Sequence, residues 1–203
     1  LRLIYRWLAA LTTIFITGSI GLALVLISFG TLRNSLSQYY FNYISLFILK
    51  IMGFAANIPE KKHFPKGPVY YTFNHNSNLD VFLLTSLGLK NVRYLLSEKT
   101  LKYFPLIFSA KALGSFYIPQ QHHLKRRLKF LIRITNLLKR NRHLSMFGSA
   151  EGVHLHRYAI APFNKGIFHM AMDAKLNIVP LYIHIPKESL TDDFKNAKGG
   201  TLK

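Results

Sequence analysis

The chain has 203 residues, of which 27 are lysine or arginine and 8 are aspartate or glutamate, so its formal net charge is +19. So large a positive charge predicts an anionic partner, either nucleic acid or an acidic membrane surface. The sequence contains no cysteine, which excludes disulfides, thiolate catalysis and thiolate metal sites.

The charge is unevenly distributed along the chain. Residues 1–60 contain four basic side chains, whereas residues 61–147 contain sixteen basic and only two acidic ones. An apolar N-terminal third therefore precedes a strongly basic part. This order favours a membrane over nucleic acid as the partner, because a nucleic-acid module has no use for an apolar third. We expect membrane-anchoring helices over residues 1–60 and a separate α/β domain over residues 61–203.

The first predicted element is the uncharged segment Trp7–Leu32, which lies between Arg6 and Arg33. A helix needs about 20 apolar residues to cross the hydrocarbon core of a bilayer, so this segment is long enough. A core helix that is apolar on all sides is hard to cover in so small a domain. The segment therefore predicts a membrane helix.

A second apolar stretch, Tyr39–Ile58, carries its polar residues, which include Asn42 and Lys50, within one stripe of about 140° on a helical wheel. This pattern is typical of an interfacial helix or of the second leg of a hairpin. We expect a two-helix anchor that leaves the basic domain on the cytoplasmic face. Whether the helices span the bilayer or re-enter it stays open.

From Pro65 onward, short apolar runs alternate with helical patterns. The predicted strands are Val69–Phe73, Val92–Ser97, Ser115–Ile118, Leu144–Phe147 and Ile178–His184. The predicted helices are Leu79–Leu87, Tyr103–Leu113, Leu124–Lys139 and Lys165–Ala174. Alternating strands and helices predict an α/β fold with a mixed, largely parallel central sheet flanked by helices.

The predicted helix Leu124–Lys139 is strongly two-sided. Its predicted apolar face consists of Leu124, Leu128, Leu131, Ile132, Thr135 and Leu138, and its other face is basic. The basic face is either solvated or pressed against anionic lipid, where each basic side chain contributes roughly 1 kcal/mol.

The segment that starts at Val69 carries the strongest chemical signal. It predicts a strand, a short loop and the start of a helix, with His75 leaving the carboxyl end of the strand, where open α/β sheets bind ligands. If the loop curls back, the carboxylate of Asp80 reaches one imidazole nitrogen and leaves the other as a base. This arrangement is a catalytic triad without its own nucleophile, so the nucleophile must come from the substrate.

The spacing alone also fits a structural role. Ser77-x-x-Asp80 matches a capping box, in which Asp80 merely starts a helix, and both roles can coexist. The nine histidines form no recognisable metal set, so no metal and no other cofactor is expected.

Four blocks in order resemble the 1-acylglycerol-3-phosphate O-acyltransferase family of glycerolipid acyltransferases. Asn74-His75-x4-Asp80 matches the family's Asn-His-x4-Asp block. Gly114 to Gln120 matches the second block, with Gln120 in place of arginine. Glu151-Gly152 matches the core of the third block, whose flanking phenylalanine, proline, threonine and arginine are absent. Val179-Pro180 matches the fourth block.

The resemblance implies a role for each matched residue. It makes His75 the base and Asp80 its orienting group. It also implies a substrate-binding set of Asn74, Gly114, Gln120, Glu151 and Gly152. His154 and Arg157 are added to this set as nearby substitutes for the missing arginines. Two arginines that would hold a phosphate are replaced, so the acceptor headgroup stays open.

The implied activity is acyl transfer at a membrane. The chain would move a fatty acyl chain from acyl-CoA or acyl-carrier protein to the hydroxyl of a lysophosphatidic acid-like acceptor. Its other partners would be membrane lipids and the anionic bilayer surface, and not nucleic acid. The alternatives are a non-catalytic lipid-binding member of the same fold, an acyltransferase for a different lipid alcohol, and a lipid hydrolase.

Overall fold

The computed structural model describes residues 2–75, 77–152, 162–185 and 201–202. A five-stranded sheet forms its centre, with the spatial order β4-β3-β5-β2-β6. The strands are β2 (Val69–Phe73), β3 (Val92–Ser97), β4 (Phe116–Ile118), β5 (Ser145–Ser149) and β6 (Asn177–Leu181). All four pairings in this sheet are parallel, which confirms the predicted α/β fold. A separate parallel pair joins β1 (Ala55–Ala56) to β7 (Thr201–Leu202).

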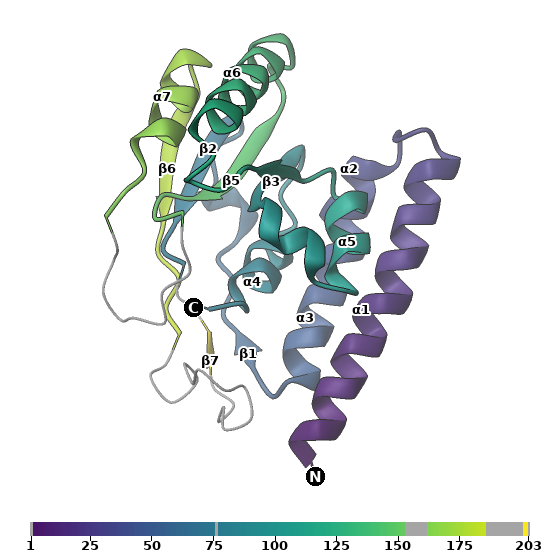
Figure 1. Ribbon diagram of the computed structural model, residues 1–203. Helices are drawn as coiled ribbons and strands as arrows, with labels where there is room; N and C mark the ends of the chain where they lie inside the picture. Colours follow the sequence, from purple (N-terminus) through teal and green to yellow (C-terminus); the bar gives the residue numbers. More distant parts are fainter. Residues whose placement is uncertain (1, 76, 153–161, 186–200, 203) are drawn as a thin grey trace.

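Helices cover both faces of the sheet (Figure 1). On one face lie α6 (Leu124–Arg140) and α7 (Lys165–Asp173), and on the other lie α4 (Asp80–Ser86), α5 (Leu106–Ala112) and the N-terminal helices. Successive side chains of a strand point to opposite faces. Tyr71 of β2 therefore packs in the core under α3 and α4, whereas its neighbour Tyr70 packs in the core under α6 and α7. Short 3-10 helices, η2 (Lys61–His63) and η3 (Glu98–Lys102), precede β2 and α5.

The N-terminal region contains α1 (Arg2–Ile27), α2 (Arg33–Ser35), the π-helical η1 (Leu36–Tyr40) and α3 (Phe41–Ile51). Within the described residues, α1 is the one helix long and apolar enough to cross a membrane. The expected two-helix anchor is therefore corrected to one apolar helix. The second helix has only 11 residues, about 16 Å at 1.5 Å per residue, half a hydrocarbon core.

The long helix α1 packs against the domain. At Gly18 a Cβ atom would lie 2.6 Å from Oγ of Ser109 on α5, so only glycine allows this close approach. The Phe15 ring of α1 lies 5.4 Å from the ring of Phe104 and 5.7 Å from that of Phe108. The Tyr40 hydroxyl donates to the Thr17 carbonyl at 3.0 Å. These contacts tie α1 to both α5 and the second helical leg.

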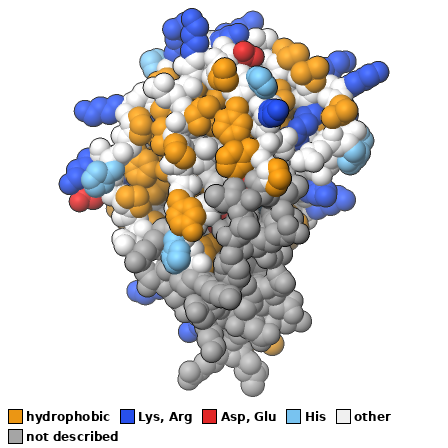
Figure 2. Space-filling view, turned by 90° about the vertical axis from the view of Figure 1, so that its left-hand side faces the viewer, with side chains coloured by type: hydrophobic (Ala, Val, Ile, Leu, Met, Phe, Trp, Pro, Cys, Tyr) orange, Lys and Arg blue, Asp and Glu red, His pale blue; other side chains and the backbone are white. Residues whose placement is uncertain are grey.

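The buried face of α6 differs from the predicted one. Its buried residues are Phe130, Ile134, Thr135 and Leu138. Leu124, Leu128 and Ile132 were predicted to be buried but are exposed. Both sets follow an i, i+4, i+8 spacing, so the sequence offers two apolar stripes and the sheet selects one. On the side of α7 and β6, hydrophobic side chains gather in the middle of the described surface, with Lys and Arg around its margin (Figure 2).

Candidate active site

The carboxyl ends of β2 and β5 meet at one edge of the sheet. Phe73, the last residue of β2, pairs in register with Ser149, the last residue of β5. Because the two strands are parallel, the segments that follow them leave the sheet side by side. This register brings His75 and Glu151, which are 76 positions apart in sequence, to the same place.

His75 and Asp80 are in direct contact. Nδ1 of His75 donates a hydrogen bond to Oδ2 of Asp80 over 2.7 Å. The His75 side chain is 30% exposed, whereas that of Asp80 is 1% exposed. A carboxylate at Nδ1 places the proton on that nitrogen and leaves Nε2 as the basic nitrogen. The pairing predicted from the five-residue spacing is therefore present, with the buried carboxylate behind a partly exposed imidazole.

The loop between these residues is held by its own hydrogen bonds. The backbone N–H of Ser77 donates to Oδ2 of Asp80 at 3.2 Å, and Oγ of Ser77 accepts from the N–H of Leu79 at 3.1 Å. The first bond is the return half of a capping box, and α4 begins at Asp80. Asp80 thus accepts both from the backbone at the helix start and from His75, so the contacts that the two predicted roles require are present together.

Glu151 holds the backbone of His75. Glu151 is only 2% exposed, and its Oε1 accepts a hydrogen bond from the backbone N–H of His75 at 3.0 Å. The N–H groups of His75 and Ser77 are thus both committed to carboxylates. In this arrangement these two N–H groups therefore do not serve as donors to an oxyanion.

Gly152 makes the turn that follows Glu151. Its φ is +66°, and a Cβ at this position would lie 2.5 Å from Nδ2 of Asn164 and 3.8 Å from Nε2 of Gln121. A side chain here would be strained in conformation and crowded by the asparagine amide. The close approach of Gln121 also places the loop after β4 beside the Glu151-Gly152 turn.

Asn74 fastens the end of β2 to the segment after β6. Its Nδ2 donates to the carbonyl of Ile183 at 2.9 Å, and its Oδ1 accepts from the N–H of Ile183 at 2.7 Å. The side-chain amide therefore completes a pair of bonds like those between two strands. Asn74 is only 7% exposed, so this residue positions His75 from the preceding side.

Gln120 lies beyond β4 and is also held within the protein. Its Nε2 donates to Oγ of Ser97 at 2.7 Å, and its backbone N–H donates to Oε1 of Glu98 at 3.1 Å. Oε2 of Glu98 in turn accepts from Nη2 of Arg126 at 3.1 Å. The side-chain amide and the backbone N–H of Gln120, and the guanidinium group of Arg126, are thus all bonded to neighbouring side chains.

Of the remaining predicted residues, Gly114 lies away from this edge of the sheet. Gly114 precedes β4, at the opposite end of the sheet from His75, because Leu95 pairs with Phe116 and Gly114 is therefore level with Arg93 at the start of β3. His154 and Arg157 lie outside the described residues. Among the described residues, no group of three or more His, Asp or Glu side chains is placed to hold a metal ion.

Comparisons with known proteins agree with the resemblance seen in the motifs. Residues 55–184 match the family model described as acyltransferase. The 1-acyl-sn-glycerol-3-phosphate acyltransferase of Saccharomyces cerevisiae is 27% identical over 138 residues, which cover 67% of this chain and 45% of the yeast protein. The enzyme of the same name from Limnanthes douglasii is 27% identical over 177 residues, covering 80% of this chain and 57% of the plant protein.

The fold also has a solved counterpart. The crystal structure of the 1-acyl-sn-glycerophosphate (LPA) acyltransferase PlsC from Thermotoga maritima aligns with a TM-score of 0.70 at 13% sequence identity. The alignment covers 100% of this chain and 84% of that one, and it shows a shared fold. The chain spans about half the length of the curated relatives described above, 45% and 57% respectively.

Proposed function

Because the chain belongs to the acyltransferase family, we propose that it is an enzyme that moves a fatty acyl chain from a thioester to the hydroxyl of a lysophosphatidic acid-like lipid. The observation that carries this proposal is the 2.7 Å hydrogen bond from Nδ1 of His75 to the buried carboxylate of Asp80. The acyl donor is acyl-CoA or acyl-carrier protein. The names of the relatives support the lysophosphatidic acid-like acceptor.

In the proposed reaction, Nε2 of His75 removes the proton from the acceptor hydroxyl as its oxygen attacks the thioester carbonyl. Asp80 holds the imidazole in position and stabilises the imidazolium that forms. The tetrahedral intermediate collapses, the carbon–sulfur bond breaks, and the leaving thiolate takes the proton from His75. The products are an ester and a free thiol. Since the substrate supplies the nucleophile, no acyl-enzyme forms.

The structure supports distinct roles for the residues around His75. We propose that Asp80 orients the ring and that Glu151 and Asn74 fix the backbone at His75 and at the residue before it. Gly152 allows the tight turn that follows Glu151. Gly114, Gln120, His154 and Arg157 stay predicted substrate-binding residues. The hydrogen bonds of Gln120 to Ser97 and Glu98 must rearrange if its amide is to reach a substrate.

The test is acyl transfer by the purified full chain in detergent. Labelled acyl-CoA and acyl-carrier protein would each be offered with lysophosphatidic acid and with lysolipids of larger headgroup. We expect labelled diacyl product with the wild type and a loss of about 10³-fold in turnover with His75→Ala. His143→Ala removes an exposed histidine two residues before β5 and serves as the matched control.

Other results identify the alternatives. Lipid binding without turnover would assign the chain to the non-catalytic alternative. Release of free fatty acid in the absence of acceptor would indicate a hydrolase. Full turnover by His75→Ala would remove the catalytic assignment. A preference for another lysolipid would support the same acyl-transfer chemistry with a different acceptor.

We further propose that residues 1–60 anchor the domain of residues 61–203 on the cytoplasmic face without crossing the bilayer. The packing of α1 along α5 supports this arrangement, because a helix tied to the domain over Phe15 and Gly18 cannot leave it to span. The chain has no cysteine, so single cysteines can be introduced cleanly. A membrane-impermeant thiol reagent should label Tyr5→Cys, near the start of α1, and Lys139→Cys in the domain from the same side. Labelling from opposite sides would establish a span.

A further inference from the structure

Two arginines from distant parts of the chain meet at the far end of the sheet. Arg33 is the first residue of α2, and its Nε donates to the carbonyl of Ala112 at the end of α5 over 3.2 Å. Arg93 lies near the start of β3, and its Nη2 donates to Oδ1 of Asn34 over 3.1 Å. These bonds orient both guanidinium groups and fasten the helical leg to the sheet.

The two side chains converge on Gly114. A Cβ atom at Gly114 would lie 2.9 Å from Nε of Arg93 and 3.0 Å from Cδ of Arg33. Both residues are only partly exposed. Burial and, to a lesser extent, the charge of Arg33 lower the pKa of Arg93 to about 10. Two like charges are thus held together in a place where water screens them poorly.

No described carboxylate offsets this pair. The ion pairs among the described residues join Lys62 to Glu60, His75 to Asp80 and Arg126 to Glu98. The Nη groups of Arg33 make no hydrogen bond with the described residues. An adjacent pair of guanidinium groups with donors to spare is well suited to the oxygens of a phosphate, which accept forked hydrogen bonds from arginine.

The pair lies beside an exposed apolar turn. Phe29, between α1 and α2, is 97% exposed, and Leu32, next to Arg33, is 44% exposed. An apolar tip adjacent to a cationic pair is the arrangement that a lipid headgroup above its acyl chains would match.

This location is separate from the candidate active site. In the sheet, Arg93 is level with Met146 and, through it, with Tyr70. His75 follows Tyr70 by five residues, about 16 Å along the strand direction. In a lysophosphatidic acid the phosphate and the free hydroxyl are only a few bonds apart. An acceptor with its hydroxyl at His75 therefore cannot place its own phosphate on Arg93.

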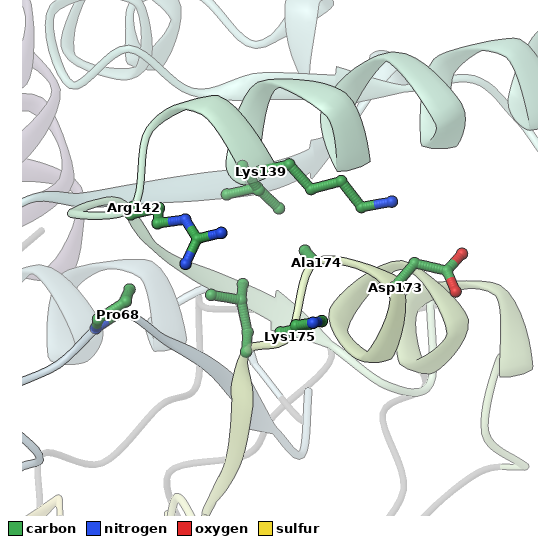
Figure 3. A pocket seen from close by; sticks show the side chains of 8 residues that line it. Pro68, Lys139, Arg142, Asp173, Ala174 and Lys175 are labelled. Carbon is green, nitrogen blue, oxygen red and sulfur yellow. The ribbon is translucent and has the colours of Figure 1, made fainter.

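A pocket at the ends of α6 and α7 offers a contrast (Figure 3). It has a volume of about 300 Å³, and its lining includes Lys139, Arg142 and Lys175. It also includes Asp173, and it lies at the carboxyl ends of two helices, where the helix dipole favours cations. The helix ends and Asp173 thus explain the cations of this pocket. The partly exposed Arg33 and Arg93 have only neutral partners among the described residues, the carbonyls of Ala112 and Val92 and the side chain of Asn34.

We propose that Arg33 and Arg93 form a binding site for a phosphate group, either the headgroup of a membrane lipid or free phosphate. The first test measures the melting temperature of the full chain in detergent while inorganic phosphate replaces chloride at constant ionic strength. The wild type should be stabilised by phosphate. Arg33→Gln and Arg93→Gln should each need at least tenfold more phosphate for the same shift. Arg140→Gln, an exposed arginine at the end of α6, should behave as the wild type.

The second test identifies the source of the phosphate by flotation with phosphatidylcholine vesicles that contain either phosphatidic acid or phosphatidylserine at equal surface charge. A lipid site predicts stronger recruitment to phosphatidic acid, reduced about fivefold by each substitution. A site for free phosphate predicts the stabilisation alone, with recruitment unaffected by the substitutions.

One result would overturn the proposal. If Arg33→Gln and Arg93→Gln lower the melting temperature equally in chloride and in phosphate, and recruitment to both vesicles is unchanged, the pair is only a structural clamp. Arg33→Lys separates charge from geometry, because lysine keeps the positive charge and loses the forked pair of donors. If the site binds phosphate through that fork, Arg33→Lys should also weaken the stabilisation by phosphate. Neither test contains an acyl donor, so the result is independent of whether the chain transfers acyl groups.

Discussion

The charged side chains at the two ends of the parallel sheet differ in their partners. At the carboxyl end, the buried carboxylates of Asp80 and Glu151 each accept hydrogen bonds from the His75 region. At the amino end, Arg33 and Arg93 lie together without a described carboxylate. The first arrangement satisfies its charges internally and fixes one side chain, as a catalytic centre requires. The second leaves its charge to be satisfied from outside, as a binding site requires.

Asp80→Asn is the sharpest test of the carboxyl end of the sheet, where the charged groups have partners within the protein. Asparagine can still bond to Nδ1 of His75, but its amide no longer forces the proton onto that nitrogen or stabilises the imidazolium. We expect kcat to fall by about 10²- to 10⁴-fold with little change in melting temperature. Asp173→Asn, on the exposed end of α7, is the control. Full turnover with Asp80→Asn would reduce Asp80 to a helix-starting residue.

The role of Glu151 can be separated from substrate binding. Glu151→Ala removes the acceptor for the His75 backbone N–H, and we expect kcat to fall by about 10- to 100-fold. Glu151→Gln keeps a carbonyl oxygen in the same place and should recover most of that loss. If instead KM for the acceptor rises and glutamine gives no rescue, Glu151 binds the acceptor directly.

Gly152→Ala tests the turn that follows Glu151. The positive φ of +66° and the 2.5 Å approach to Asn164 predict a loss of about 1–2 kcal/mol of folding free energy. Chemical denaturation would measure it. Gly67→Ala is the matched control, because a Cβ at Gly67 meets nothing within 4 Å. Equal stability of the two variants would show that the turn relaxes freely.

The smallest expected effect concerns Glu98. The N–H of Gln120, and to a lesser extent the charge of Arg126, lower the pKa of Glu98. A carboxyl with a lowered folded-state pKa stabilises the fold above its ordinary pKa of 4.5, and this contribution disappears as the pH falls through the lowered value. Glu98→Gln should therefore melt slightly lower at pH 7, and the difference should vanish in acid. A constant difference at all pH values would exclude this origin.

Most elements of the domain could be predicted from local pattern. Val69–Phe73 and Val92–Ser97 are strands with the predicted bounds, because aromatic and β-branched runs suit a buried sheet. Helix α6 begins at the predicted Leu124. Its buried face could not be predicted, because Leu124 and Phe130 each begin an apolar stripe of the same spacing. The helix–sheet contact selects the stripe of Phe130.

The site was predictable only where its residues are close in sequence. Five residues separate His75 from Asp80, so a short loop and a helix start were enough to predict their contact. The bond from the His75 backbone to Glu151 depends on the register of β2 with β5, which no local pattern specifies. Gly114 is a second example of a position that only the sheet decides. Its motif predicted a place in the active site, whereas the sheet places it against Arg33 and Arg93.

By itself the sequence determined the apolar helix, the alternation of strands and helices, and the histidine with its carboxylate, since each depends on residues a few positions apart. The tertiary structure decided that α1 packs along α5, that Glu151 supports His75, and that two arginines 60 positions apart face one another. Strand register and helix docking bring distant residues together, and they depend on how the whole core packs.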